Sequence, residues 1–198
     1  MTEPTTTTEE LGVDYDVRLV PFAELKEPAH RAVHPFGKIP AYKDGTVTLF
    51  ESGAIVLHLA RKHPGLLPDD EAAAGRAVVW LFAALNTLEP PIVEREAARV
   101  REQDEPWYEP RGRILDERVR ERLGELAAFL ASREWLEGEF TVGDLMMVMV
   151  LRRLEDGPNL LEEFPTLLAY VARGEARPAY ARAFAAQKAV FDSSVASG

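Results

Sequence analysis

The spacing of hydrophobic positions changes near Pro64 and divides the chain into two parts of different character. Before Pro64, short apolar runs are interrupted by proline and glycine, as in alternating strands and helices. The pattern predicts a strand at residues 15–21, a short helix at 28–33, strands at 39–42 and 46–50, and a helix at 51–63. The two later strands flank Asp44-Gly45, a dipeptide that often closes a β-hairpin.

After Pro64 the spacing is helical throughout. Apolar residues recur at three- and four-residue steps over residues 78–88 and again over 114–130. Residues 145–151 are apolar on every side and predict a buried helix, and two more helices are expected near 164–173 and from Pro178. Pro90-Pro91 should break or kink the helix that precedes them. We therefore expect a first domain at residues 1–63, a linker at 64–71 and an all-α domain at 72–198.

Composition narrows the class of protein. A chain of 198 residues with 46% hydrophobic content can bury a substantial core, and its net charge of −10 argues against a nucleic-acid partner. Because there is no cysteine, disulfides, thiolate metal sites and a cysteine nucleophile are excluded. No run of about eighteen apolar residues predicts a membrane span, and the first ten residues do not resemble a secretory signal. We therefore expect a cytoplasmic protein with no membrane partner. We also expect no metal, since the four histidines have no metal-ligand spacing.

The segment Gly37-Lys38-Ile39-Pro40 places a proline at the start of a strand. A cis Ile39–Pro40 bond would turn the amide and carbonyl of Ile39 outward, where an extended peptide could pair with them. On the dipeptide alone a trans proline is favoured, because only about 5–6% of X–Pro bonds are cis.

Glu51-Ser52 stands where a strand gives way to a helix. The Ser52 hydroxyl and the first free amides of the helix could form an anion site, and Glu51 could accept a hydrogen bond from an ammonium group. Together they suit the α-carboxylate and α-amino group of an amino acid. The alternative is that Ser52 is only a helix cap.

The joined string is more specific than either motif. His34-Pro-Phe-Gly-Lys-Ile-Pro-Ala-Tyr-Lys-Asp-Gly, followed by Thr-Val-Thr-Leu-Phe-Glu-Ser-Gly-Ala-Ile, resembles the core pattern of glutathione S-transferases. The family usually has Asn-Pro in place of His34-Pro35. Trp80-Leu-Phe-Ala-Ala-Leu and Arg177-Pro-Ala-Tyr resemble bacterial members, so the likeness covers about residues 9–187. It implies an α/β thioredoxin-like N-terminal domain, here incomplete, followed by an all-α C-terminal helical bundle.

The resemblance also implies a site for glutathione as co-substrate. It implies a cis Pro40, an Ile39 backbone that pairs with the cysteinyl part of glutathione, and a γ-glutamyl end held by Glu51 and Ser52. Lys38 falls where some classes place a glutamine or lysine near the tripeptide.

Two further parts of the resemblance concern single motifs. Lys26 matches a lysine that in plant-type classes approaches the glycyl carboxylate, although a lysine on a polar loop is usually only solvated. Thr141 and Asp144 read as a capping box, with Phe140 stapled onto Leu145, and we count both as folding residues.

The catalytic position of the family has no visible counterpart. In the family a Tyr, Ser or Cys follows a first strand, and the next helix ends in a sequence like residues 9–15. Only eight residues precede Glu9, so the first strand and most of the first helix are expected to be absent. Threonines 5–8 could supply a hydroxyl, but a polar tail is the interpretation we favour.

Three functional interpretations follow. The first is conjugation of the glutathione thiolate to a small apolar electrophile by a homodimer, with the helix around residues 78–88 contributing to the interface. The second is a non-catalytic glutathione-binding or scaffold protein of the same fold. The third is that a wrong start or a deletion has shortened the sequence. The catalytic residue and the electrophile are unknown.

Overall fold

The computed structural model describes residues 3–155 and 159–196, which form two compact units. The first unit comprises Met1–Leu67 together with Pro178–Gly198, and the second comprises Pro68–Arg177. The predicted division at residues 64–71 stays a prediction. The structure does place the last helix among the contacts of the first unit, although the sequence pattern groups it with the second domain.

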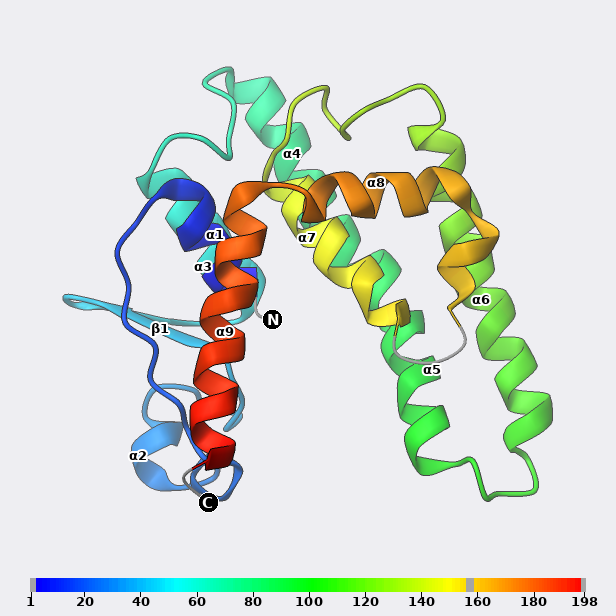
Figure 1. Cartoon of the computed structure of the whole chain (residues 1–198), viewed down its shortest axis with the longest axis horizontal. Helices are drawn as coiled ribbons and strands as arrows, with labels where there is room; N and C mark the ends of the chain where they lie inside the picture. The colour runs from blue at the N-terminus through cyan, green and yellow to red at the C-terminus, as the bar shows by residue number, and fades with distance from the viewer. Residues whose placement is uncertain (1–2, 156–158, 197–198) are drawn as a thin grey trace. The chain divides into compact units, whose positions relative to one another are not determined.

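The described part of the first unit combines helices with a β-hairpin (Figure 1). Its elements are α1 (Glu3–Leu11), η1 (Phe22–Glu24), α2 (Pro28–Arg31), β1 (Ala41–Asp44), β2 (Val47–Phe50), α3 (Ser52–Lys62) and α9 (Pro178–Ala196). The strands pair antiparallel, with Ala41 opposite Phe50 and Asp44 opposite Val47. Gly45 closes the turn with a φ of 57°, a conformation that favours glycine, so the predicted hairpin is confirmed.

Helix α1 corrects the expectation of a polar tail at threonines 5–8. It packs against α3 and α9, and the side chains of Thr6, Thr7 and Thr8 are buried. The Thr7 hydroxyl donates to the carbonyl of Glu3 at 2.8 Å, and the Thr8 hydroxyl donates to that of Thr5 at 2.9 Å. Threonine can be buried here because its one polar group bonds back to its own helix.

The predicted strand at residues 15–21 is wrong. This segment is irregular, and Val17 and Leu19 are half exposed. An isolated extended segment gains nothing from its β propensity without a neighbouring strand to complete the ladder. Within the described residues, the sheet contains only β1 and β2. The expected absence of the family's first strand stays a prediction, since α1 is simply the first element described.

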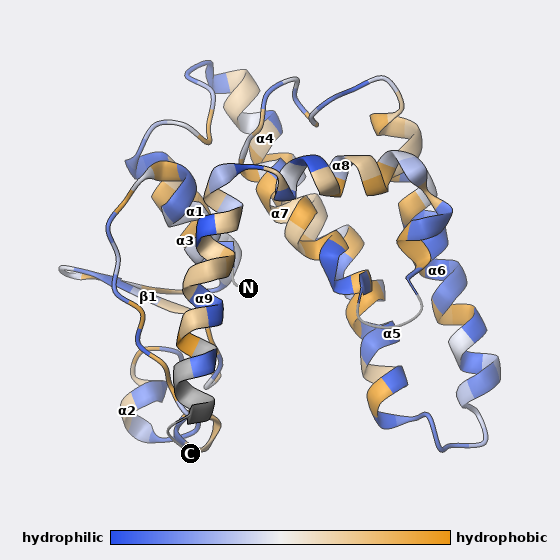
Figure 2. Cartoon of the chain, in the orientation of Figure 1, coloured by the Kyte–Doolittle hydropathy of each residue, from blue (hydrophilic) through white to orange (hydrophobic). Residues whose placement is uncertain are grey.

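The second unit is helical and has an apolar centre (Figure 2). Its elements are α4 (Glu71–Ala83), η2 (Ala84–Leu88), α5 (Glu89–Arg101), α6 (Tyr108–Leu130), α7 (Val142–Arg152), η3 (Arg153–Glu155), η4 (Leu160–Glu163) and α8 (Pro165–Glu175). Every residue from Val142 to Leu151 is buried, which confirms the predicted central helix. Pro90 and Pro91 lack amide donors, and the helix that precedes them accommodates this by a π-helical turn at η2.

None of the helices at residues 3–155 and 159–196 is both long and apolar enough to cross a bilayer.

Candidate functional site

The open end of the hairpin brings the two predicted site segments together. Ala41, the first residue of β1, pairs with Phe50, the last residue of β2. Pro40 precedes Ala41 and Glu51 follows Phe50, so these two residues lie at the same end of the hairpin. Lys38, Ile39 and Pro40 therefore enter the sheet beside the point where Glu51 and Ser52 leave it.

Ile39 presents its backbone without an internal partner. The Ile39–Pro40 peptide bond is cis, and the Ile39 side chain is 53% exposed. No hydrogen bond joins the main-chain amide or carbonyl of Ile39 to any residue that the structure describes. Lys38, which precedes it, is exposed. Main-chain donors and acceptors in this state can pair with an extended ligand.

Glu51 has an unusual backbone conformation at the start of α3. Its φ of 70° lies in the left-handed region, and it is the one non-glycine residue with a positive φ among those described. Such a conformation costs about 1–3 kcal/mol and is often found at ligand sites. Glu51 occupies the N-cap position and makes no side-chain capping bond, so Ser52 is the first helical residue and not the cap. The exposed Glu51 carboxylate stands beside the free amides of the first turn.

Lys26 donates hydrogen bonds to main-chain carbonyls of this chain, which the sequence analysis did not anticipate. Its Nζ donates to the carbonyls of Phe36 and Gly37, at 2.8 and 3.0 Å. The ammonium group of Lys26 therefore holds the loop that leads to Ile39, and it has three N–H bonds in all.

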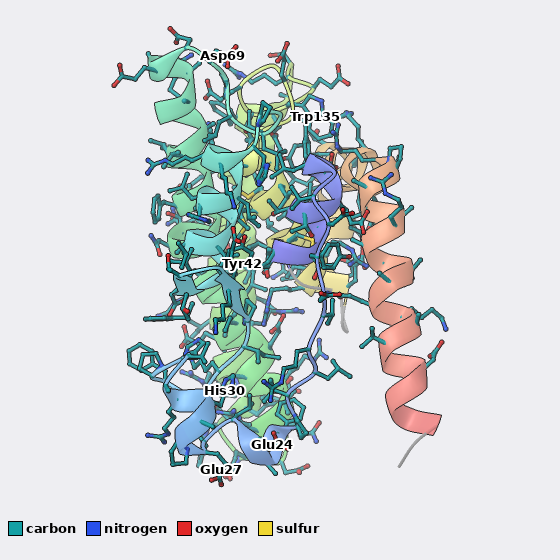
Figure 3. The ribbon with its side chains drawn as sticks, turned by 90° about the vertical axis from the view of Figure 1, so that its left-hand side faces the viewer. Glu24, Glu27, His30, Tyr42, Asp69 and Trp135 are labelled. Carbon is teal, nitrogen blue, oxygen red and sulfur yellow. The ribbon has the colours of Figure 1, made fainter. Side chains whose placement is uncertain are left out.

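His30 is a residue that the sequence analysis missed. Its Nε2 lies 2.8 Å from the carbonyl oxygen of Lys38. In Figure 3, His30 lies with Glu24 and Glu27 at the end of the first unit below the hairpin residue Tyr42. No sequence signal could have found His30, because its role depends on a loop eight residues away in the chain.

A cluster of aromatic rings packs together in and around the loop at residues 34–40. His34 is buried, and its ring centroid lies 4.9 Å from that of Phe50 and 6.3 Å from that of Phe36. The His30 ring stacks on His34 at 6.3 Å with an interplanar angle of 20°. Because Phe50 directly precedes Glu51, this cluster links the two segments of the site.

An ion pair ties the hairpin to α3. Lys62 donates a hydrogen bond to the carboxylate of Asp44, and this bond holds the pKa of Asp44 below its usual value. The same bond raises the pKa of Lys62. Tyr42 also donates to Asp44, at 3.3 Å, and its ring lies 5.9 Å from that of His58.

The capping box lies in the second unit, away from these segments in the sequence. The Asp144 carboxylate accepts hydrogen bonds from the amides of Leu136 and Thr141, at 2.9 and 3.0 Å, and from the Tyr170 hydroxyl at 2.9 Å. Thr141 in turn accepts from the amide of Gly143. Burial raises the pKa of Asp144 against the opposing effect of these donors, and it raises the pKa of Tyr170 strongly.

Two kinds of side chain bear on catalysis: hydroxyls that could stabilise a thiolate and groups that could hold a metal ion. The hydroxyls of Thr7 and Thr8 donate to carbonyls of their own helix, so neither points a donor at the Ile39 backbone. Among the residues described, no group of three or more His, Asp or Glu side chains could hold a metal ion.

Comparison with known proteins agrees with this architecture. The family model of the glutathione S-transferase N-terminal domain matches residues 1–61. Glutathione S-transferase 4 of Zea mays is 34% identical over 185 residues, which cover 86% of this chain and 81% of that protein. The probable glutathione S-transferase GSTF2 of Oryza sativa subsp. japonica is 31% identical over 183 residues, covering 86% and 84% of the two chains.

Solved structures give the same result. A glutathione transferase of Burkholderia graminis, crystallised with two glutathione molecules bound per subunit, superposes with a TM-score of 0.79 at 28% identity. The match covers 91% of this chain and 81% of that one. The fold is thus an N-terminal thioredoxin-like domain with a small sheet, followed by a helical domain. With this fold and these relatives, the chain belongs to the glutathione S-transferase family.

Proposed function

We propose that this chain binds glutathione at the open end of the hairpin. The observation that carries the proposal is the pairing of two unpartnered features there. The first is the Ile39 backbone, which bonds to no described residue. The second is Glu51, which has a positive φ and stands at the N-terminus of an eleven-residue helix without forming a side-chain cap. The glutathione bound to the Burkholderia graminis relative supports the same ligand.

Each residue has a role that fits one part of the tripeptide. The Ile39 amide and carbonyl, next to Pro40, pair with the cysteinyl backbone. The Glu51 carboxylate accepts from the γ-glutamyl ammonium group, while the Ser52 hydroxyl and the first amides of α3 bind its α-carboxylate. Lys38 lies on the same loop, and its role in the proposal is to stand near the tripeptide.

Lys26 keeps a subsidiary role in the proposal. Two loop carbonyls already accept hydrogen bonds from its Nζ, and an ammonium group carries three N–H bonds. One N–H remains for the glycyl carboxylate. The positive charge of Lys26 favours that anion as well.

The reaction proposed is conjugation of the glutathione thiolate to a small apolar electrophile, as in a bacterial-type transferase located in the cytoplasm. The residue that would stabilise the thiolate stays unassigned. The hydroxyls of Thr7 and Thr8 are engaged within α1. A glutathione-binding protein without turnover is the second candidate.

A homodimer is part of the proposal. Val79 and Phe82 lie three residues apart on α4, and they are 64% and 49% exposed. Exposed apolar residues at this spacing suit a self-association surface. Sedimentation velocity should show a dimer for the natural chain and a shift toward monomer for Phe82→Glu; a monomeric natural chain would contradict the dimer.

Binding is tested by calorimetry with glutathione. The natural chain should bind, and Glu51→Gln should weaken the affinity by at least about tenfold, because a hydrogen bond between charged groups is worth about 1.5–3 kcal/mol. Glu27→Gln is the matched control, since Glu27 is also an exposed glutamate at the N-cap of a helix in the first unit, but with an ordinary φ of −69°. If the natural chain does not bind glutathione, the proposal is wrong.

Turnover is tested separately with a chloronitrobenzene electrophile and glutathione. Formation of the thioether above the uncatalysed rate supports the transferase. Binding without thioether formation supports the non-catalytic candidate.

A further inference from the structure

The loop that leads to Ile39 is held by its main-chain carbonyls. Three successive carbonyl oxygens, those of Phe36, Gly37 and Lys38, each lie within 3.0 Å of a side-chain nitrogen. Lys26 supplies the nitrogen for the first two and His30 supplies it for the third. Since a carbonyl can only accept, His30 must donate through Nε2–H.

The hydrogen bond to Lys38 fixes more than the carbonyl itself. The carbonyl of Lys38 and the amide of Ile39 belong to one peptide unit, and that peptide bond is trans. In a planar trans unit the C=O and N–H bonds point in opposite directions. A donor that holds the Lys38 oxygen on one side therefore directs the Ile39 N–H to the other side.

The His30 ring is itself held in place. It is half-buried and stacks on His34, which is buried against Phe50. Short helix α2, which begins with Pro28, carries His30 and gives its backbone a fixed start. The imidazole therefore acts from a fixed position.

From this geometry we infer that His30 is a positioning residue, which aims the Ile39 amide by holding the carbonyl of Lys38. The inference rests on the proposed glutathione site in naming the ligand that this amide meets. His30 does not touch glutathione in this scheme. It lowers the cost of binding because the amide already points in the direction in which the cysteinyl carbonyl must approach.

The first test combines affinity with bond orientation. His30→Ala should weaken glutathione binding about fivefold to tenfold, the worth of one neutral hydrogen bond. The N–H residual dipolar coupling of Ile39 in the ligand-free protein should change as well. A residue that only supported the fold would lower the melting temperature and leave this coupling unaltered.

Two further variants separate the hydrogen bond from the ring. His30→Gln keeps an N–H donor of similar reach and should recover most of the affinity and the original Ile39 coupling. Ala29→Ser, an exposed neighbour on the same turn, should change neither quantity. Equal losses in His30→Ala and His30→Gln would overturn the inference, because the ring and not its donor would then be responsible.

The outcome can be distinguished from that of the proposed function. If the natural chain does not bind glutathione, the proposed function fails, while an altered Ile39 coupling in His30→Ala still supports the positioning role. An unaltered coupling overturns that role whatever the affinity. Should His30→Ala not fold, nitrogen chemical shifts of the natural chain decide: the neutral His30 ring should carry its proton on Nε2, and a proton on Nδ1 overturns the inference.

Discussion

Helix α7 and the loop at residues 34–40 keep their shapes by opposite means. Helix α7 is surrounded by apolar neighbours, and a buried carboxylate, Asp144, closes its first turn. The loop exposes Phe36 and Ile39 by more than half, and its course is set by hydrogen bonds from side chains to carbonyls. A helix held by burial tolerates little change anywhere, whereas a loop held by a few polar bonds depends on single donors.

The largest effect is expected at Asp144. Asp144→Ala leaves the Leu136 amide and the Tyr170 hydroxyl buried without their acceptor, and should cost about 4 kcal/mol in free energy of unfolding. Urea denaturation followed by circular dichroism measures it. Glu139→Ala, an exposed glutamate nearby in the sequence, is the control and should stay within about 0.5 kcal/mol. A loss at Asp144 below about 1 kcal/mol would remove the contrast with the loop.

Two glycines with nearly the same backbone test how closely the loop is packed. Gly37 and Gly45 have φ values of 58° and 57°. A Cβ at Gly37 would meet the Leu25 carbonyl oxygen at 2.3 Å, whereas none of the atoms around Gly45 lies within 4 Å of an added Cβ. Gly37→Ala should therefore cost about 3 kcal/mol and Gly45→Ala about 1 kcal/mol in unfolding free energy. Equal losses would show that only φ matters.

A smaller effect is expected where α9 meets α1. Arg182 donates to the Glu9 carboxylate and to the Glu9 carbonyl, both at 2.8 Å, but its side chain is 55% exposed. Arg182→Ala should lower the melting temperature slightly, with a loss of about 0.5–1 kcal/mol. Lys188→Ala breaks an exposed pair with Asp192 within α9 alone, so it should cost less. If both variants lose the same stability, the Arg182–Glu9 interaction between α1 and α9 contributes no more than an exposed pair within one helix.

The last effect is absent at neutral pH and is a dependence of stability on alkaline pH. Burial, a hydrogen bond to Glu9 and the charge of Glu9 raise the pKa of Tyr15 from 10.0 to about 12. The folded state thus keeps the proton longer than the unfolded state, so stability from Tyr15 is complete below about pH 10 and is lost toward pH 12. The stability of the natural chain should fall more steeply over this range than that of Tyr15→Phe. Parallel pH curves would contradict the raised pKa.

Local signals explain what could be predicted from the sequence. The hairpin followed from Asp44-Gly45 between apolar runs, and α7 followed from an unbroken apolar segment. Both depend on residues close together in the chain. The motif at residues 34–55 predicted that Ile39 and Glu51 belong to one site. It could do so because proteins that share this motif share the fold that brings the two residues together.

Features that depend on distant partners could not be predicted. Residues 15–21 have the alternation of a strand, but a strand requires a neighbour that the segment itself does not encode. Threonines 6–8 look like solvent-exposed residues, but they are buried because their helix packs on α3. The hydroxyls of Thr7 and Thr8 bond back to α1 itself. The donors at Lys26 and His30 become visible only when the loop is seen folded over them.

The hold on the loop through its carbonyls has a consequence for sequence change. Lys26 and His30 recognise oxygen atoms that every amino acid possesses, so the identities of residues 36 and 38 do not enter into the bonds. Lys38, whose side chain is exposed, can therefore be exchanged widely while the path of the chain is kept. A library randomised at residue 38 would vary the chemistry presented beside the Ile39 backbone on a constant scaffold, which makes this loop a natural starting place for engineering ligand preference.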